Sequence, residues 1–276
     1  MAHVEQLVGS YRAWASNGAA QAPAWLKDLR EGGIARFHDL GFPNMKQEAW
    51  RFTNVAPIAE GSFALARPPA RIPKLEEIQP FLLLEAGYRL VFVDGFFQPA
   101  LSTPFFDDVQ SLAHVVAHRP DLVREHLGKY AATQDRPFSA LNTAFVHEGA
   151  FVHVPARATV EYPVQLLFLV TSGKPVVMHP RNLVLVDREA RVSIVRPTPR
   201  STTLCTGPTR SRRSLWVMAR VSTTTASNGR ALVPTTSRRP SHTRDATVPS
   251  TSISSRSAER WRVTTSVRCW RVRAGR

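Results

Sequence analysis

Three histidines in the second half of the sequence have side chains that can bind a metal ion or transfer a proton: His147, His153 and His179. Six residues along an extended strand span ~20 Å, whereas two ligands of one zinc ion lie within a few ångströms of each other. We therefore interpret His147 and His153 as surface histidines, or as strand histidines with a hydrogen-bond partner. His179 precedes Pro180, and we expect it to order a turn.

The acidic pairs and the serines form no recognisable catalytic pattern. Asp107-Asp108 is interpreted as the cap region at a helix N-terminus, where negative charge is favourable, and Glu76-Glu77 as a solvated helix face. Ser139 lacks the Gly-x-Ser-x-Gly turn of a hydrolase nucleophile. There is also no glycine-rich phosphate loop or Walker pattern. We predict no catalytic, cofactor-binding or metal-binding residue among these groups.

The elements that must position these residues begin with helices. Between residues 4 and 14, apolar side chains recur at spacings of three and four, which predicts a helix that ends at Asn17-Gly18. The same spacing predicts a second helix up to Leu40, with Pro23 at its start and Gly41 as its C-cap. A short helix is expected around Gln47–Phe52.

Strands are predicted further along the chain. Asp94-Gly95 lies between two apolar runs, 88–93 and 96–97, which is typical of a β-hairpin. Two short helices are expected at 111–117 and 121–130, separated at Pro120. From Phe138 onward, short β-rich runs at 145–146, 151–154, 164–170, 183–186 and 192–195 alternate with glycine, proline and aspartate. This rhythm predicts a barrel, a sandwich or a β-helix, and does not choose among them.

The net positive charge of the chain comes entirely from its last 81 residues. The net charge is +15, from 36 basic and 21 acidic residues. Residues 196–276 hold 17 arginines and two acids, so the preceding 195 residues carry 19 bases and 19 acids. The tail also holds 28 serines and threonines, which leaves few large apolar groups to offset chain entropy. We therefore expect a disordered tail.

Several classes of protein are disfavoured by composition. The N-terminus lacks a signal-peptide pattern, and no apolar run reaches the ~18–20 residues needed to span a bilayer. Both cysteines, Cys205 and Cys269, lie in the tail, so disulfides do not support the body. These features favour a cytoplasmic protein.

A series of motifs points to a family. The segments Gly-Phe-Pro at 41–43, Glu-Ala-Trp-Arg-Phe-Thr-Asn at 48–54 and Val-Asp-Gly-Phe at 93–96 are followed by longer motifs at 138–145, 149–155, 161–168 and 179–182. In this order, over about residues 24–195, they resemble the SufB/SufD family of iron–sulfur cluster assembly proteins. The N-terminal motifs resemble the SufD branch more than the SufB branch. The signature residues are Gly41, Phe42, Pro43, Glu48, Trp50, Arg51, Thr53, Asn54, Asn142, Pro155, His179, Pro180 and Asn182.

The resemblance implies a fold and a role. We expect an α+β, mainly β, protein with a helical N-terminal region (1–55), a mixed α/β lead-in (56–137), the start of a truncated right-handed parallel β-helix core (138–195) and the disordered tail (196–276). The implied role is that of a non-enzymatic scaffold subunit. It works with a SufB-like paralogue and a SufC-like ATPase and handles an iron–sulfur cluster only transiently. The family's functional residues, including a C-terminal histidine, lie beyond the matched segment. No cofactor is therefore assigned to this chain, and SufC binding is expected to be lost.

The abrupt end of the match at Val195 has an explanation in the reading frame. When the tail is back-translated and read one nucleotide earlier, Trp216-Val217-Met218-Ala219 must give Gly-X-Gly, because tryptophan and methionine each have one codon. With suitable synonymous codons, neighbouring stretches give valine runs that end in glycine, as in a β-helix. We hypothesise a one-nucleotide loss near residue 196, in the gene or in its sequencing. On that hypothesis Cys205 and Cys269 are accidental.

Two other functions remain open. A cupin-like β-barrel metalloenzyme would need a clustered set of histidines and carboxylates, which the body lacks. A basic protein that binds nucleic acid would act through the arginine-rich tail, by non-specific counterion release. The body, at net zero charge, argues against specific binding of nucleic acid.

Overall fold

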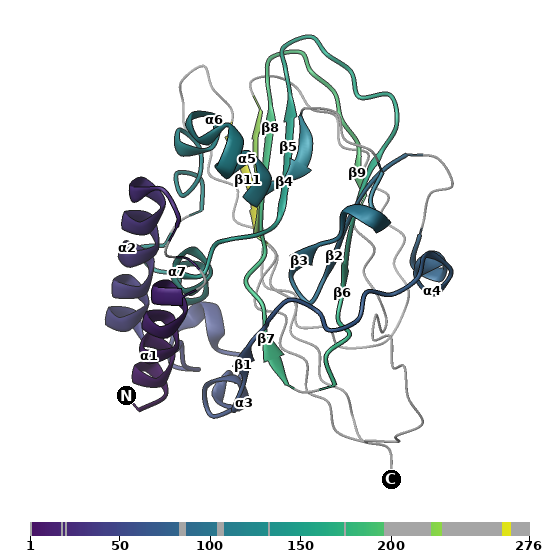
Figure 1. Ribbon diagram of the computed structural model, residues 1–276. Helices are drawn as coiled ribbons and strands as arrows, with labels where there is room; N and C mark the ends of the chain where they lie inside the picture. The colour runs from purple at the N-terminus through teal and green to yellow at the C-terminus, as the bar shows by residue number, and fades with distance from the viewer. Residues whose placement is uncertain are drawn as a thin grey trace.

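A computed structural model describes residues 2–17, 19, 21–82, 87–103, 108–131, 133–173 and 175–195, together with the backbone of 222–227 and 261–265. The fold is α+β, as expected, with the N-terminal helices on one side of two mixed sheets of four and five strands (Figure 1). A third, two-stranded parallel sheet pairs residues 64–65 with residues 176–177. No helix in the described ranges is long and apolar enough to cross a membrane.

The helical region has the predicted limits. Helix α1 spans Ala2–Asn17 and α2 spans Ala24–Leu40, with Gly41 as its C-cap at a φ of 63°. An unpredicted helix, α7 (Pro137–Ala144), packs against α2. A Cβ at Gly33 would lie 2.6 Å from the main-chain nitrogen of Ala144, so the two helices approach each other at a position where only glycine fits.

One sheet is built on the predicted hairpin. Strand β2 (Tyr88–Val93) pairs antiparallel with β3 (Phe96–Phe97), and Asp94 and Gly95 have φ values of 50° and 85°. Positive φ at both central residues is the geometry of a type I′ turn. The other edge of β2 pairs in parallel with β6 (Val164–Leu169), which pairs in parallel with β9 (Ile194–Val195).

The second sheet has the order β11-β10-β8-β5-β4. Strand β4 (Val109–Ser111) is antiparallel to β5 (Ala150–Val154), and β5 is parallel to β8 (Arg181–Val186). The 145–146 segment, which we predicted as a strand, instead follows the C-terminus of α7. The remaining elements are α3 (Ala56–Ala59), β1 (Ala64–Leu65), α4 (Leu75–Ile78), α5 (Leu112–His118), α6 (Pro120–Arg124), β7 (Val176–Val177), and the 3-10 turns η1 (Glu48–Trp50), η2 (Gln79–Phe81) and η3 (Pro99–Leu101).

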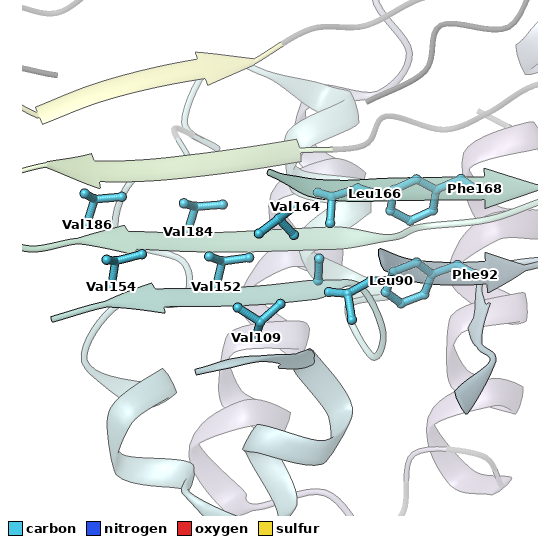
Figure 2. Packing of buried hydrophobic residues seen from close by; sticks show 11 residues of the cluster. Leu90, Phe92, Val109, Val152, Val154, Val164, Leu166, Phe168, Val184 and Val186 are labelled. Atoms are coloured by element: carbon cyan, nitrogen blue, oxygen red, sulfur yellow. The ribbon is translucent and has the colours of Figure 1, made fainter. Parts of the chain in front are cut away.

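Alternate residues of the two sheets point into a shared core. Figure 2 shows Val152 and Val154 beside Val184 and Val186, with Phe92 stacked on Phe168 at a ring-centroid distance of 4.7 Å. The opposite faces of the sheets are also buried, one under α5 and α6 and the other under α4, η2 and η3. Burial of both faces explains why β6 and β8 are almost continuously apolar.

The tail prediction is tested at only two places. Residues 222–227 form β10, parallel to β8, and residues 261–265 form β11, antiparallel to β10. In these two segments the structure has strands where we predicted disorder, and their threonine and valine residues have high β-propensity. The rest of the tail, including Cys205 and Cys269, lies outside the described residues, so the frame hypothesis stays a prediction. The expected parallel β-helix is not shown by these sheets.

Candidate functional site

Four of the five later signature residues, Asn142, His179, Pro180 and Asn182, meet at one buried junction between α7, β5 and β8. The side-chain Nδ2 of Asn142 donates to the Pro180 carbonyl at 3.2 Å, and Oδ1 of Asn182 accepts from the Ala150 amide at 2.8 Å. Both asparagines are fully buried. Each therefore joins two segments that lie more than thirty residues apart in the sequence.

Main-chain contact holds the same junction together. The Arg181 amide donates to the Glu148 carbonyl at 2.8 Å. Gly149 has a φ of 148°, and a Cβ there would lie 1.9 Å from the Arg181 carbonyl oxygen. The segment before β5 therefore lies directly against the start of β8, with no room for a side chain between them.

Two buried arginines lie near the C-terminal end of α7. Arg30 of α2 donates from Nε to the Val146 carbonyl at 2.8 Å and stacks over the ring of Trp14 at 4.9 Å. Arg181 donates from its guanidinium to Oγ1 of Thr143 at 2.6 Å. Burial lowers the pKa of each to about 10, so both stay charged at neutral pH. A cation is favoured at a helix C-terminus, where the carbonyl dipoles point.

His179 lies at the junction as a neutral, aromatic group. Its ring stacks on Phe145 at a centroid distance of 4.7 Å and an interplanar angle of 13°, and it is 2 % exposed. Neither ring nitrogen has a hydrogen-bond partner among the described residues. Burial, followed by the proximity of His147, lowers the pKa of His179 to about 3. It lies in the segment just before β8, where its observed contact is the stack on Phe145; its role in ordering a turn stays a prediction.

The other two histidines have different surroundings. His153, in β5, is partly buried between Asp108 at 3.5 Å and Asp187 at 3.2 Å, so the prediction of a strand histidine with a partner is confirmed. His147 is partly buried, lies outside the strands, and packs against Phe96. Its Nε2 is buried without a partner, and burial lowers its pKa. The prediction of a surface or strand residue is wrong for His147, because the chain turns inward after α7.

The acidic side chains fall into buried and exposed groups. Glu148, partly buried beside the junction, accepts hydrogen bonds from the amides of Gly149, Phe97 and Ala113, yet burial raises its pKa to about 7. Asp108 contacts Arg119 as well as His153, while Asp107 lies outside the described residues. Glu77 binds Arg71 at 2.7 Å on α4, whose neighbouring Glu76 is exposed.

The earlier signature residues lie away from the junction, at the start of α7. Phe42 and Trp50 both contact the ring of Phe138, at 6.1 and 5.4 Å. The neighbouring residues Glu48, Arg51 and Asn54 are exposed. Gly41, Pro43 and Thr53 belong to this same loop region, and Pro155 is exposed in the turn after β5. Helix α7 thus connects the two groups of signature residues, one at each end.

The chemistry of the junction is that of positioning. Within the described ranges, no three or more histidine, cysteine, aspartate or glutamate side chains could hold a metal ion together. Sequence reasoning missed Arg30 and Glu148 here. Arg30 could have been found from its place between Leu26 and Ile34 on the apolar face of α2, where a charged residue needs a buried partner.

Comparison with known proteins gives one consistent match. The family described as SufBD protein N-terminal region matches residues 1–166. An iron–sulfur cluster assembly SufBD family protein of Synechocystis is 32 % identical over 187 residues, covering 66 % of this chain and 41 % of the relative. The SufD protein of Bacillus subtilis is 29 % identical over 188 residues, which cover 63 % of this chain and 41 % of that protein. The SufB protein of the same bacterium is 36 % identical over 95 residues, which cover 34 % of this chain and 19 % of that protein. The chain spans about two-fifths of the length of the first and second of these relatives.

Proposed function

Because this chain belongs to the SufBD family, whose named members are iron–sulfur cluster assembly proteins, we propose that it is a SufD-like, non-enzymatic subunit of an assembly scaffold. Its partners would be a SufB-like paralogue and a SufC-like ATPase, in the cytoplasm. The iron–sulfur cluster would be the cargo of the complex, not a resident cofactor of this chain.

The observation that supports a scaffold best is the parallel stacking of successive chain segments in both sheets. Phe151 of β5 pairs with Leu183 of β8, 32 positions later. Val164 of β6 pairs with Ile194 of β9, 30 positions later, and an isolated bridge joins Thr159 to Arg191. Near-equal offsets at three places around the chain are what one turn of a solenoid requires. We therefore propose that residues 150–195 are the first turns of a parallel β-helix.

The buried junction would then fix the helical region on this solenoid. Asn142 and Arg181 bond the C-terminal half of α7 to the start of β8, and Asn182 of β8 bonds the first residue of β5. A scaffold subunit needs such rigidity because its partners bind surfaces that lie far apart. This role requires no catalytic group at the junction.

The out-of-frame tail would remove the later turns and whatever follows them. In the proposal, this chain retains the N-terminal region of a SufD-like subunit and has lost the part that binds the ATPase. Binding of SufC should therefore depend on the reading frame after residue 195.

A pull-down experiment tests this proposal. The SufB-like and SufC-like proteins of the same organism are co-expressed with the chain as written, and with a version in which one nucleotide is restored near codon 196. We expect the restored version to retain SufC and the present chain to lose it. Normal SufC binding by the present chain would refute the loss of the binding region. Failure of the restored version to bind either partner would refute the SufD-like role.

A further inference from the structure

Helix α5 carries two histidines on one exposed face, outside the buried junction. His114 and His118 are four residues apart, so they lie one above the other on the helix. Both are exposed, and their ring centroids are 4.1 Å apart with an angle of 22° between the planes. We propose that His114 and His118 form a binding site for a divalent first-row transition-metal ion of the zinc or nickel type. This proposal does not depend on the proposed function.

The hydrogen bond of His118 presents one of its ring nitrogens as a metal ligand. Its Nδ1 lies 2.9 Å from the carbonyl oxygen of His114. A carbonyl oxygen only accepts, so Nδ1 must carry the proton and donate it. In a neutral ring, Nε2 then holds the lone pair. A metal-binding histidine commonly has this arrangement, with its second nitrogen bonded to a backbone carbonyl.

The local charges favour a neutral His114. Burial, followed by the neighbouring His118 and Arg119, lowers its pKa. A lowered pKa leaves the imidazole unprotonated at neutral pH, which is the form that binds a metal ion. Arg119 itself contacts Asp108 at 3.5 Å, so an anionic partner offsets part of the cationic charge at this end of α5.

The backbone that carries the two rings is held in place before any ion arrives. Leu112 and Val115 bury the opposite face of α5 against the sheet, and the Ser111 side chain accepts a hydrogen bond from the His114 amide at 3.1 Å. The backbone of the site is therefore fixed, and ion binding needs to order only the side chains. Paired histidines at this spacing on a helix supply two of the zinc ligands in metalloproteases. With two imidazoles, water would complete the coordination, and zinc, nickel and copper all accept imidazole nitrogen.

Calorimetric titration of the full chain with Ni²⁺ tests the site. We expect one ion to bind per chain at this site, and His114→Ala or His118→Ala to weaken that binding about tenfold or more, since loss of even a second-shell partner costs that much. His38→Ala is the matched control, because His38 is also exposed on a helix but pairs with Glu5. The titrations are done in a Cys205→Ser/Cys269→Ser background, so that thiolates do not compete.

The pH dependence of Ni²⁺ binding gives a second test of the site. Affinity should fall as the pH is lowered and the imidazoles take up protons, and circular dichroism should show the same helical content in all variants. If the double variant His114→Ala/His118→Ala binds Ni²⁺ as tightly as the His38→Ala control, the proposal is refuted. Equal weakening in the His38→Ala control would also refute it.

Discussion

Gly149 and Arg181 touch through their main chains, at a point where a Cβ on Gly149 would stand 1.9 Å from the Arg181 carbonyl oxygen. The Arg181 amide donates to the carbonyl of the neighbouring Glu148, so the two segments run together at the start of β5 and β8. This contact sets the spacing between the starts of the paired strands β5 and β8. Any change that separates the segments also displaces the buried Arg181 side chain from Thr143.

Gly149→Ala should therefore be severely destabilising. The new methyl group clashes with main chain, which has no rotamer to adopt, and the φ of 148° is itself strained for alanine. We expect a loss of about 3 kcal/mol or more in the free energy of unfolding. Urea denaturation followed by circular dichroism measures it. Gly173→Ala, where nothing lies within 4 Å of the new Cβ, is the control; equal stability losses in the two variants would contradict the close approach.

The adjacent glycines of α2 should respond in opposite directions to the same substitution. No atom lies within 4 Å of the position that a Cβ would take at Gly32, so Gly32→Ala should stabilise the helix by about 0.5–1 kcal/mol. At Gly33 the same methyl group would meet the Ala144 nitrogen at 2.6 Å and push α2 away from α7. Gly33→Ala should therefore be destabilising by about 1–3 kcal/mol. Thermal unfolding of the two variants, measured side by side, tests this prediction. If both variants are stabilised, α2 does not pack closely on α7 at Gly33.

His179 should make the protein sensitive to acid. Its ordinary pKa of 6.5 falls to about 3 in the folded state, so the unfolded chain binds a proton first. Stability is then complete above pH 6.5 and is lost as the pH falls from 6.5 towards 3, by about 1.4 kcal/mol per unit. His179→Phe keeps the stack on Phe145 and has nothing to protonate. The difference in free energy of unfolding between the variant and the native chain should shift by about 3 kcal/mol in favour of the variant when the pH is lowered from 7.5 to 4. If the stability of the variant and that of the native chain change equally with pH, His179 is not buried and neutral in the folded state.

These predictions depend on helices, turns and contacts that could be predicted from the sequence to different degrees. Helices α1 and α2 have a polar and an apolar face, and Asp94-Gly95 is the residue pair that a two-residue hairpin needs, so their positions could be predicted. Helix α7 could not, because its residues from Ser139 to Ala144 are all buried and leave no periodic polar face. The motif resemblance pointed to Asn142, His179 and Asn182. It could not reveal the contact of Gly149 with Arg181, which exists only once two distant segments are packed together.

Glu148 should give a pH dependence of the opposite sign. Burial raises its pKa from 4.5 to about 7, so the folded state favours the protonated carboxyl group. The stability that this supplies is complete below pH 4.5 and is lost as the pH rises through 7. Glu148→Gln keeps an oxygen for the amides of Gly149 and Ala113. Between pH 4 and pH 8, the variant should gain about 3 kcal/mol relative to the native chain. Glu76→Gln, on the exposed face of α4, is the control in the same urea titrations, and an equal gain there would refute the role of burial.

Limited digestion with trypsin should separate the body from the tail. Residues 196–276 hold 17 arginines, of which trypsin can cleave after 14, because Arg196 and Arg239 precede proline and Arg276 ends the chain. The sequence of β10 holds only serine, threonine and alanine. Main-chain hydrogen bonds without apolar burial hold a strand weakly. The body, in contrast, buries its aromatic and aliphatic side chains in continuous cores. We expect an early, persistent fragment that ends near Arg196, identified by intact mass. Persistence of a fragment that includes β10 and β11 would mean that the tail is part of the folded protein, and it would contradict the frame hypothesis.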